Sequence, residues 1–235
     1  DQGLLRQDQW KATDTANSYS IDYRHSLQGL PLGQSSSDGE NTVHEYDELG
    51  RLKKTTDGSL VAEFDYDEDG RPCRTLTTDT LSGRKVTAVQ TYDDLGRYLE
   101  RTVALYDGST HTLKLTWRDD DQLHERSHYC DGAQLLKETF SYDDLDRLTK
   151  IDYQGTQLPR NRANREIVME MYRFNDLDHL TQCQTRCADG AADIAVFTPK
   201  TDGSFQLQSV THTLQPDYPA SQTFRYDEDG NMLND

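Results

Sequence analysis

The chain has 235 residues, a formal net charge of -17 and a mean hydropathy of -0.92. Its 42 acidic residues against 25 basic ones oppose binding to nucleic acid or to an anionic membrane surface, and no run of 18 apolar residues could span a bilayer. The 13 Tyr, 6 Phe and 2 Trp supply apolar surface on partly polar side chains, which predicts an ordered chain with a thin core. The start, Asp1-Gln2-Gly3, has neither a Met nor a signal-peptide h-region, so we expect a fragment of a longer protein.

A seven-residue motif recurs along the chain: an aromatic residue at position 1, Asp at position 2, Gly at position 5 and, in most copies, Arg at position 6. Five clear copies span residues 46–52, 66–72, 92–98, 142–148 and 226–232. Degenerate copies begin at Trp117 and Phe174, and a weaker one spans Tyr23 to Gly29. The residues that we assign to the structural motif are Tyr46, Asp47, Gly50, Arg51, Tyr66, Asp67, Gly70, Arg71, Tyr92, Asp93, Gly96, Arg97, Trp117, Tyr142, Asp143, Arg147, Phe174, Tyr226, Asp227 and Gly230.

The residue types of the motif predict a hairpin tip. Asp at position 2 and Gly at position 5 are what a type I turn followed by a left-handed residue prefers, and the Asp side chain can accept from backbone N–H groups two residues on. Gly takes a positive φ without Cβ strain. Asp146 and Asp178 stand in that slot and are tolerated substitutes, because short polar side chains visit the left-handed region more readily than most.

A second class of turn lies between the motifs. Asp-Gly pairs stand at 38–39, 57–58, 107–108, 131–132, 189–190 and 202–203, joined by Ser82-Gly83 and Gln154-Gly155. Asp-Gly between alternating residues is a strong hairpin signal. The two turn classes alternate, so the sequence predicts an all-β antiparallel meander of hairpins.

Strand alternation predicts one face with an aromatic and aliphatic ladder and one polar, wet face. Counting back by two from position 1 gives Phe64, Phe140 and Phe224, with polar residues between. In the strand before Phe174, Glu170 interrupts the ladder while the opposite face is apolar, which suggests cover on both sides. A sheet with one apolar face must be covered or curl, so we expect it to be curved or spiralling.

The pattern divides the chain into an irregular N-terminal segment, 1–22, and a repeat array, 23–235, interrupted by a long loop near 155–167. Four cysteines are too few and too unevenly spaced for a disulfide framework, so we expect reduced thiols. Cys183 and Cys187 could donate to a metal, but no second pair stands nearby, which favours a structural role.

One string has the letters of a zinc protease, His124-Glu-Arg-Ser-His128. On a helix the two histidines share a face and can hold one zinc ion, with Glu as general base. On a strand they lie about 13 Å apart along the axis, too far to chelate one ion. The string aligns with Leu99-Glu-Arg-Thr-Val103 of the preceding repeat, which favours the strand.

Asp65-x-Asp67-x-Asp69-Gly70 resembles the opening of an EF-hand loop, but Leu76 stands where the bidentate acid is required, so we expect weak or no calcium binding. No nucleophile elbow or Gly-rich phosphate loop occurs. We therefore predict no enzyme activity, no catalytic or metal residue and no cofactor.

The repeated Tyr-Asp-x-x-Gly-Arg-Leu unit resembles the YD repeat of Rhs proteins, of the B and C subunits of bacterial toxin complexes, and of teneurins. Segments such as Leu158-Pro-Arg-Asn-Arg and Pro216-Asp-Tyr-Pro are similar to Rhs-like, toxin-complex-like proteins of Pseudomonas-type bacteria. The resemblance implies a hollow shell of antiparallel strands that encloses a C-terminal toxin polypeptide. In bacterial members an aspartate-dependent self-cleavage frees the toxin, and no residue of this chain is assigned to that step.

The resemblance implies a structural segment of a secreted bacterial protein that assembles in the cytoplasm before export. Its partners would be the remainder of its own shell and the enclosed toxin. A carbohydrate- or protein-binding β module is the alternative, because exposed aromatic residues often form ligand platforms. Exposed strand edges also predict concentration-dependent self-association.

Overall fold

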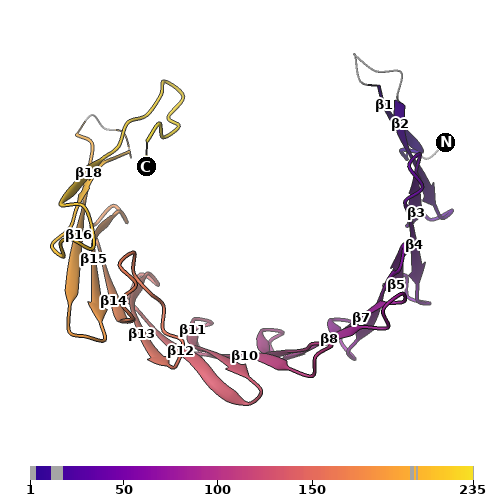
Figure 1. Ribbon diagram of the computed structural model, residues 1–235, viewed down its shortest axis with the longest axis horizontal. Coiled ribbons are helices and arrows are strands. Elements are labelled where there is room, and N and C mark those ends of the chain that lie inside the picture. The colour runs from indigo at the N-terminus through magenta and orange to yellow at the C-terminus, as the bar shows by residue number, and fades with distance from the viewer. Residues whose placement is uncertain (1–3, 12–17, 202–203, 205, 235) are drawn as a thin grey trace. The chain divides into compact units, whose positions relative to one another are not determined.

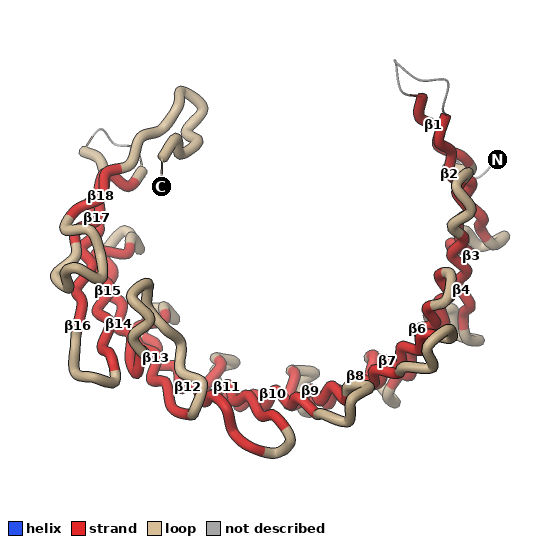
Figure 2. The backbone as a smooth tube through the Cα atoms, viewed as in Figure 1, coloured by secondary structure: helices blue, strands red, loops and turns tan. Residues whose placement is uncertain are grey.

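The computed structural model describes residues 4–11, 18–201, 204 and 206–234. These residues form 18 strands and no helix, so the predicted all-β class is confirmed (Figure 2). Accordingly, no helix that could cross a membrane occurs in this described part of the chain. The chain divides into two compact units, Asp1–Thr112 and Leu113–Asp235, which are described in turn as unit 1 and unit 2.

Unit 1 is an antiparallel meander in which each strand pairs with the next one in sequence (Figure 1). Its strands are β1 (Gln7–Lys11), β2 (Ser18–His25), β3 (Pro31–Ser36), β4 (Asn41–Tyr46), β5 (Leu52–Asp57), β6 (Leu60–Tyr66), β7 (Pro72–Asp79), β8 (Lys85–Tyr92) and β9 (Tyr98–Ala104). Strand β10 (Thr110–Trp117) contains the boundary between the units.

Unit 2 continues the same pattern from β11 to β18, again with each strand antiparallel to the next. Its strands are β11 (Leu123–Cys130), β12 (Ala133–Tyr142), β13 (Leu148–Gly155), β14 (Ile167–Phe174), β15 (Leu180–Cys187), β16 (Ala192–Pro199), β17 (Leu207–Thr211) and β18 (Ser221–Thr223). The sheet bends within each unit (Figure 1), and the predicted antiparallel meander is confirmed.

The hairpins that carry the motif share one register. Position 1 pairs with position 7, and the register shifts at position 1, as it does where one extra residue forms a bulge beside the turn. The pairs are Tyr46 with Leu52, Tyr66 with Pro72, Tyr92 with Tyr98, Tyr142 with Leu148, and Phe174 with Leu180. The motif therefore ends one strand and begins the next at every copy in these five hairpins.

Two predictions about local structure are wrong. The segment 1–22 is not irregular where it is described, because β1 pairs with β2 and Trp10 lies 5.7 Å from Tyr19, ring centroid to ring centroid. Gln154-Gly155 is not a turn either. Gly155 ends β13 with a φ of 137°, and a Cβ there would lie 2.2 Å from the Leu135 carbonyl oxygen, so glycine is needed for a close backbone approach. The Asp-Gly pair at 202–203 lies outside the described residues.

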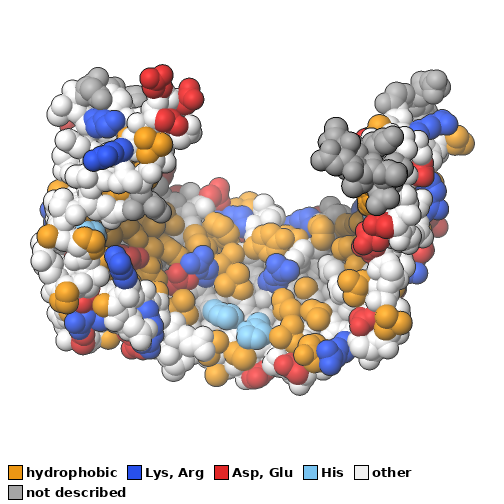
Figure 3. All heavy atoms as spheres, turned by 45° about the horizontal axis from the view of Figure 1, so that its top comes forward, with side chains coloured by type: hydrophobic (Ala, Val, Ile, Leu, Met, Phe, Trp, Pro, Cys, Tyr) orange, Lys and Arg blue, Asp and Glu red, His pale blue; other side chains and the backbone are white. Residues whose placement is uncertain are grey.

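The buried hydrophobic residues of the described chain, all less than 9% exposed, lie in unit 2. They are Phe140, Ile151, Ile167, Met169, Cys187, Ala195 and Val210. Ile167 and Met169 lie in β14, where the sequence suggests cover on both faces. On the face that Figure 3 shows, groups of hydrophobic side chains lie at the surface with charged side chains scattered among them. The core is thin, as composition predicts, and it belongs to unit 2.

Candidate functional site: the Tyr-Asp turns and the contacts between them

Each clear motif folds into one hydrogen-bonded turn. In the turn after β4, the amide of Asp47 donates to the Arg51 carbonyl at 2.9 Å, and the amide of Gly50 donates to the Asp47 carbonyl at 3.0 Å. The Asp47 carboxylate accepts from the amides of Leu49 and Arg51 at 3.0 and 2.9 Å. The same bonds recur at the turns of Asp67, Asp93, Asp143 and Asp227. Asp suits position 2 because its side chain accepts from two amides that the turn leaves without a backbone acceptor.

Position 5 lies in the left-handed region in every motif turn. Gly50, Gly70, Gly96 and Gly230 have φ between 78° and 85°. Where the sequence departs from Gly, the conformation persists: φ is 64° at Asp121, 62° at Asp146 and 61° at Asp178. The turn geometry therefore fixes the conformation and tolerates a short polar residue.

Position 6 Arg closes its own turn. The Nε atoms of Arg51, Arg71 and Arg97 each donate to the second carboxylate oxygen of their turn at 2.7 Å, and that of Arg147 does so at 2.8 Å. The amide of Arg51 holds the pKa of Asp47 below its usual value, and the Arg147 guanidinium has the same effect on the pKa of Asp143. The carboxylates therefore stay ionised, and keep accepting these hydrogen bonds, at lower pH than an ordinary Asp would.

The same guanidinium reaches the next repeat. Arg51 lies 4.4 Å from the ring centroid of Tyr66, and Arg71 lies 4.6 Å from that of Tyr92. In unit 2, Arg147 lies 5.1 Å from the Phe174 ring. One Arg thus pairs with a carboxylate in its own turn and stacks on the position 1 aromatic residue of the following turn, which is a favourable cation–π geometry.

The aromatic residue completes the link in the opposite direction. The hydroxyl of Tyr66 donates to the Leu52 carbonyl at 2.7 Å, and that of Tyr92 donates to the Pro72 carbonyl at 2.7 Å. These acceptors are position 7 of the preceding motif. Tyr46, Tyr142 and Tyr226 make the corresponding bonds to Pro31, Leu123 and Leu207. We call the row of turns joined by these contacts the turn ladder.

Polar residues in the glycine slot add contacts to the ladder. Arg147 donates to the Asp178 carboxylate at 2.7 Å and to the Asn175 carbonyl at 3.2 Å. Gln122, at position 6 of its turn, donates to the Asp146 carboxylate at 2.6 Å. At Asp146 and Asp178 the departure from Gly is therefore accompanied by a direct hydrogen bond between successive turns.

The degenerate copies keep the turn and change its side-chain partners. The turn after Trp117 has Arg118 at position 2, and the carboxylate of Asp120 takes over the amide of Gln122 at 3.3 Å. The turn after Phe174 uses the side-chain oxygen of Asn175, which accepts from two amides at 3.0 Å.

The assignment of the weak copy to Tyr23–Gly29 is wrong by two residues. Position 1 is His25, which pairs with Pro31, and position 2 is Ser26, whose hydroxyl accepts from the amides of Gln28 and Leu30 at 3.2 and 3.1 Å. Ser replaces Asp in the same capping role. Tyr23 has the aromatic ring expected at position 1, but the turn forms around Ser26, whose hydroxyl is the position 2 acceptor.

A further motif turn lies in the long loop near 155–167, where none is predicted. Asn161 occupies position 2, Asn164 position 5 with a φ of 66°, and Arg165 position 6. The Asn161 side-chain oxygen accepts from the amides of Ala163 and Arg165 at 3.0 and 2.9 Å. The sequence signal is Asn-x-x-Asn-Arg, which matches Asp-x-x-Gly-Arg once Asn is allowed in both slots.

The sheet face of unit 2 that carries the aromatic and aliphatic side chains also has polar groups at positions where strand alternation predicts apolar residues. Arg126 donates through Nε and Nη2 to the two carboxylate oxygens of Glu138, and Glu138 is 7% exposed. Glu170 accepts from the hydroxyls of Tyr153 and Tyr172 at 2.6 and 3.0 Å. Burial, reinforced by the carboxylate, raises the pKa of both tyrosines far above the usual range. Glu170 interrupts the apolar pattern because it is an acceptor for two tyrosines.

The residues of the protease-like and calcium-like strings belong to a strand and to the contacts of a motif turn. His124 and His128 are both in strand β11, as the repeat alignment predicts. Asp67 is committed to its turn, while Asp65 and Asp69 pair with Arg74 and Arg71. Among the described residues, no three His, Cys, Asp or Glu side chains are grouped so that they could hold a metal ion.

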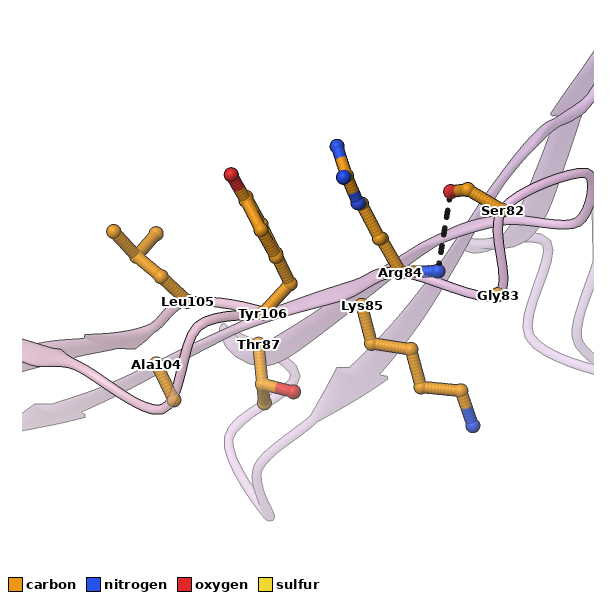
Figure 4. A pocket seen from close by; sticks show the side chains of 8 residues that line it. All are labelled: Ser82, Gly83, Arg84, Lys85, Thr87, Ala104, Leu105 and Tyr106. Atoms are coloured by element: carbon orange, nitrogen blue, oxygen red, sulfur yellow. Dashed lines mark hydrogen bonds between the residues drawn. The ribbon is translucent and has the colours of Figure 1, made fainter.

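A shallow pocket lies at the start of β8, at the end of the strand opposite to the turn ladder (Figure 4). Arg84 lies 4.5 Å from the ring centroid of Tyr106, which is 58% exposed, and the two side chains stand on the same side of the sheet beside Leu105. The Arg84 amide is held by the Ser82 hydroxyl at 3.3 Å. This is an exposed aromatic surface of the kind that ligand platforms use.

The comparisons with known proteins give a match of fold. No protein-family profile and no curated protein matches the chain. The crystal structure of TcdB2-TccC3-Cdc42 superposes on 92% of the chain with a TM-score of 0.70 at 15% identity, and that of TcdB2-TccC3 without the hypervariable C-terminal region on 93% with 0.68 at 15%. The Tc holotoxin pore of Photorhabdus luminescens matches 93% with 0.61 at 14%. The chain has the YD-repeat fold of these toxin-complex proteins. It spans only 12% or 13% of each of the chains that it matches.

Proposed function

We propose that this chain is a structural segment of a secreted bacterial Rhs- or toxin-complex-like protein, and that it forms part of a shell enclosing a C-terminal toxin polypeptide. The turn ladder is the observation that carries the proposal. It joins successive hairpins through side chains at one end of the strands. These contacts keep the strands in register although little hydrophobic core is buried. The toxin-complex fold over 92% of the chain supports the same role.

A wall segment must also contact more polypeptide, and the turn tips present suitable surface. Leucines at position 4 of the motif are 66% to 77% exposed, at Leu49, Leu95, Leu145 and Leu177. Large exposed apolar side chains at the same position of successive turns favour contact with another protein surface. We propose that these tips meet the remainder of the shell, which assembles in the cytoplasm before export. One of the matched structures is named for the removal of its hypervariable C-terminal region, which supports a C-terminal cargo here.

The test is limited proteolysis of the full-length protein. A closed shell keeps the C-terminal polypeptide undigested at protease concentrations that degrade it when it is expressed alone. The triple variant Asp47→Ala, Asp93→Ala and Asp143→Ala removes the position 2 acceptor from three turns and is expected to abolish protection. The matched control replaces the exposed neighbours Glu48, Asp94 and Asp144 with Ala and is expected to retain it. Equal digestion of the enclosed and isolated C-terminal polypeptide in the wild type would contradict the proposal.

The alternative, a carbohydrate- or protein-binding module, has one specific observation in its favour, the exposed Arg84–Tyr106 pair. A glycan array with reproducible hits that Tyr106→Ala abolishes would support it. Hits that persist in that variant would place binding elsewhere and remove the reason for this alternative.

A further inference from the structure

The motif turn in the long loop lacks its own carboxylate. In complete turns the second oxygen of the position 2 Asp accepts from the Nε of the position 6 Arg at 2.7 to 2.8 Å. Here position 2 is Asn161, whose amide nitrogen cannot accept. Instead Asp217 accepts from Arg165 Nε at 2.7 Å and from Asn161 Nδ2 at 2.9 Å, on the same carboxylate oxygen. A residue 52 positions beyond Arg165 thus supplies the group that the turn lacks.

Burial makes this contact decisive for the local structure. Asn161 is 9% exposed and Asp217 is 7% exposed. A buried carboxylate is stable only when it is paired and hydrogen-bonded, so Asp217 stays in place only while the loop turn is formed. The guanidinium of Arg165 also pairs with Asp189, in the hairpin between β15 and β16. The loop, that hairpin and Asp217 meet at one guanidinium.

Asp217 belongs to a segment that we call the strap, residues 212–220, between β17 and β18. A second buried carboxylate holds its start: Asp193, 3% exposed, accepts from the amides of Thr213 and Leu214 at 2.9 and 2.8 Å. Asp193 also lies 2.7 Å from Nδ1 of His212, whose ring stacks on Tyr218 with centroids 4.5 Å apart. The strap is therefore fixed at one end by strand β16 and at the other by the loop.

Cys187 lies beside these groups and is 2% exposed. Burial raises the pKa of its thiol, the carboxylate of Asp189 adds to the effect, and Arg165 opposes it. The amide of the next residue, Ala188, donates to the Glu166 carbonyl at 2.8 Å and ties the hairpin to the loop. A buried protonated thiol is slow to alkylate, so its reactivity reports opening of the surrounding contacts.

We propose that Asp217 is a latch, and that the strap and the loop turn open together as one local unit while the repeats around them stay folded. In a complete turn the Asp–Arg contact lies within five residues. Here the carboxylate comes from the strap, so the same contact holds the strap against the loop. The strap is thereby a built-in opening point of unit 2, at which Cys187 becomes accessible without loss of the sheet.

The test compares alkylation rates of the four cysteines by mass spectrometry in the full chain. Asp217→Ala removes one charged hydrogen-bonding partner from the loop, so alkylation of Cys187 is expected to be about tenfold faster or more. Cys73 and Cys130 are expected to be unchanged, because they belong to strands β7 and β11 and not to the loop, the strap or the hairpin between β15 and β16. The control variant Asp229→Ala, at an exposed turn tip, is expected to leave all four rates unaltered.

A rescue separates a latch from simple destabilisation. Asn161→Asp in the Asp217→Ala background returns a carboxylate to position 2, so hydrogen exchange at the amides of Ala163 and Arg165 is expected to slow to the wild-type rate. Cys187 is expected to remain reactive, because the strap stays open. If Asp217→Ala leaves Cys187 unreactive, or if Cys73 and Cys130 accelerate equally with it, the latch is refuted.

The wild-type chain gives a test that needs no variant. In native-state hydrogen exchange, the amides of Ala163 and Arg165 in the loop and of Thr213 and Leu214 in the strap are expected to exchange with one common opening constant and to be less protected than those of β12. Independent opening constants for the loop and the strap would overturn the proposal.

Discussion

Unit 1 and unit 2 are built from the same turns but are held together differently. In unit 1 the clear motifs keep Tyr, Asp, Gly and Arg, and its described part contains no buried hydrophobic residue. In unit 2 the motif drifts, yet the unit contains the whole hydrophobic core and six buried polar or charged residues. The difference indicates that the ladder and the core compensate for one another: where side chains pack, the turn sequence can vary, and where they do not, it stays complete.

The drift in unit 2 is itself compensated at the turns. Aspartate in the glycine slot costs about 1 kcal/mol of backbone strain. At Asp146 and Asp178 the side chain regains a hydrogen bond to the preceding turn, from Gln122 and Arg147.

The largest effect is expected in the core of unit 2. Phe140→Ala removes a ring that is 8% exposed and pairs with Ile151, so we expect unit 2 to lose about 3 kcal/mol of unfolding free energy. Phe64→Ala, at the corresponding place before the Tyr66 turn, should cost about 1 kcal/mol because Phe64 is only half-buried. Denaturant-dependent hydrogen exchange measures each unit separately. Equal losses in the two units would show that the core difference is not what distinguishes them.

The next effect concerns the glycine slot. Gly96→Val places a β-branched side chain at a φ of 82°, and should destabilise unit 1 by about 2 kcal/mol, whereas Gly96→Asp should cost about 1 kcal/mol. A Cβ at this site would meet Arg71 Nη1 only at 3.6 Å, so steric collision is not the reason. Thermal unfolding checks the order Gly, Asp, Val. A Val variant as stable as the wild type would contradict the left-handed requirement.

The hydroxyl links should be worth less. Tyr66→Phe removes the 2.7 Å bond to the Leu52 carbonyl and leaves the ring under Arg51, so we expect a loss of about 1 kcal/mol in unit 1. Tyr226→Phe removes a 3.1 Å bond in unit 2 and should cost less, about 0.5 kcal/mol. Urea titrations of both variants make the comparison. A larger loss of stability for Tyr226→Phe would contradict the claim that unit 1 depends more on the turn ladder than unit 2 does.

The smallest effect is expected from pH. Partial burial raises the pKa of Asp67, but the side chain and the amide of Arg71 outweigh it, so the folded pKa lies below the ordinary value of about 3.9. The stability that this carboxylate contributes is fully present above the ordinary pKa and is lost as pH falls through the folded one. Unit 1 should therefore open first on acidification below about pH 4. Asp67→Asn with Asp93→Asn should flatten this dependence. Unchanged acid sensitivity in the double variant would exclude the turn carboxylates as its source.

Turn chemistry could be predicted from the sequence more fully than packing. Asp at position 2 and Gly at position 5 are local requirements, so the reversals after Tyr46 and Tyr66 follow from a few neighbouring residues. The turn at Asn161 does not match Asp-x-x-Gly-Arg because Asn stands in both the Asp and the Gly slots. Its contact with Asp217, 52 residues beyond Arg165, is not encoded in any local pattern. Glu170 gave a visible interruption, but its partner Tyr153 lies on another strand. The turn predicted at Gln154-Gly155 is wrong because Gly155 allows a close backbone approach to Leu135 in the neighbouring strand and not a chain reversal.

The central claim is that each motif turn supports the next through its position 6 Arg. Hydrogen exchange in Arg71→Lys tests it most directly, because Lys keeps the charge but cannot both pair with Asp67 and stack on Tyr92. We expect faster exchange at the amides of Leu95 and Arg97, in the following turn, and no change at Leu49 and Arg51, in the preceding one. Exchange that is unchanged in the following turn, or that rises equally in both turns, would contradict the account.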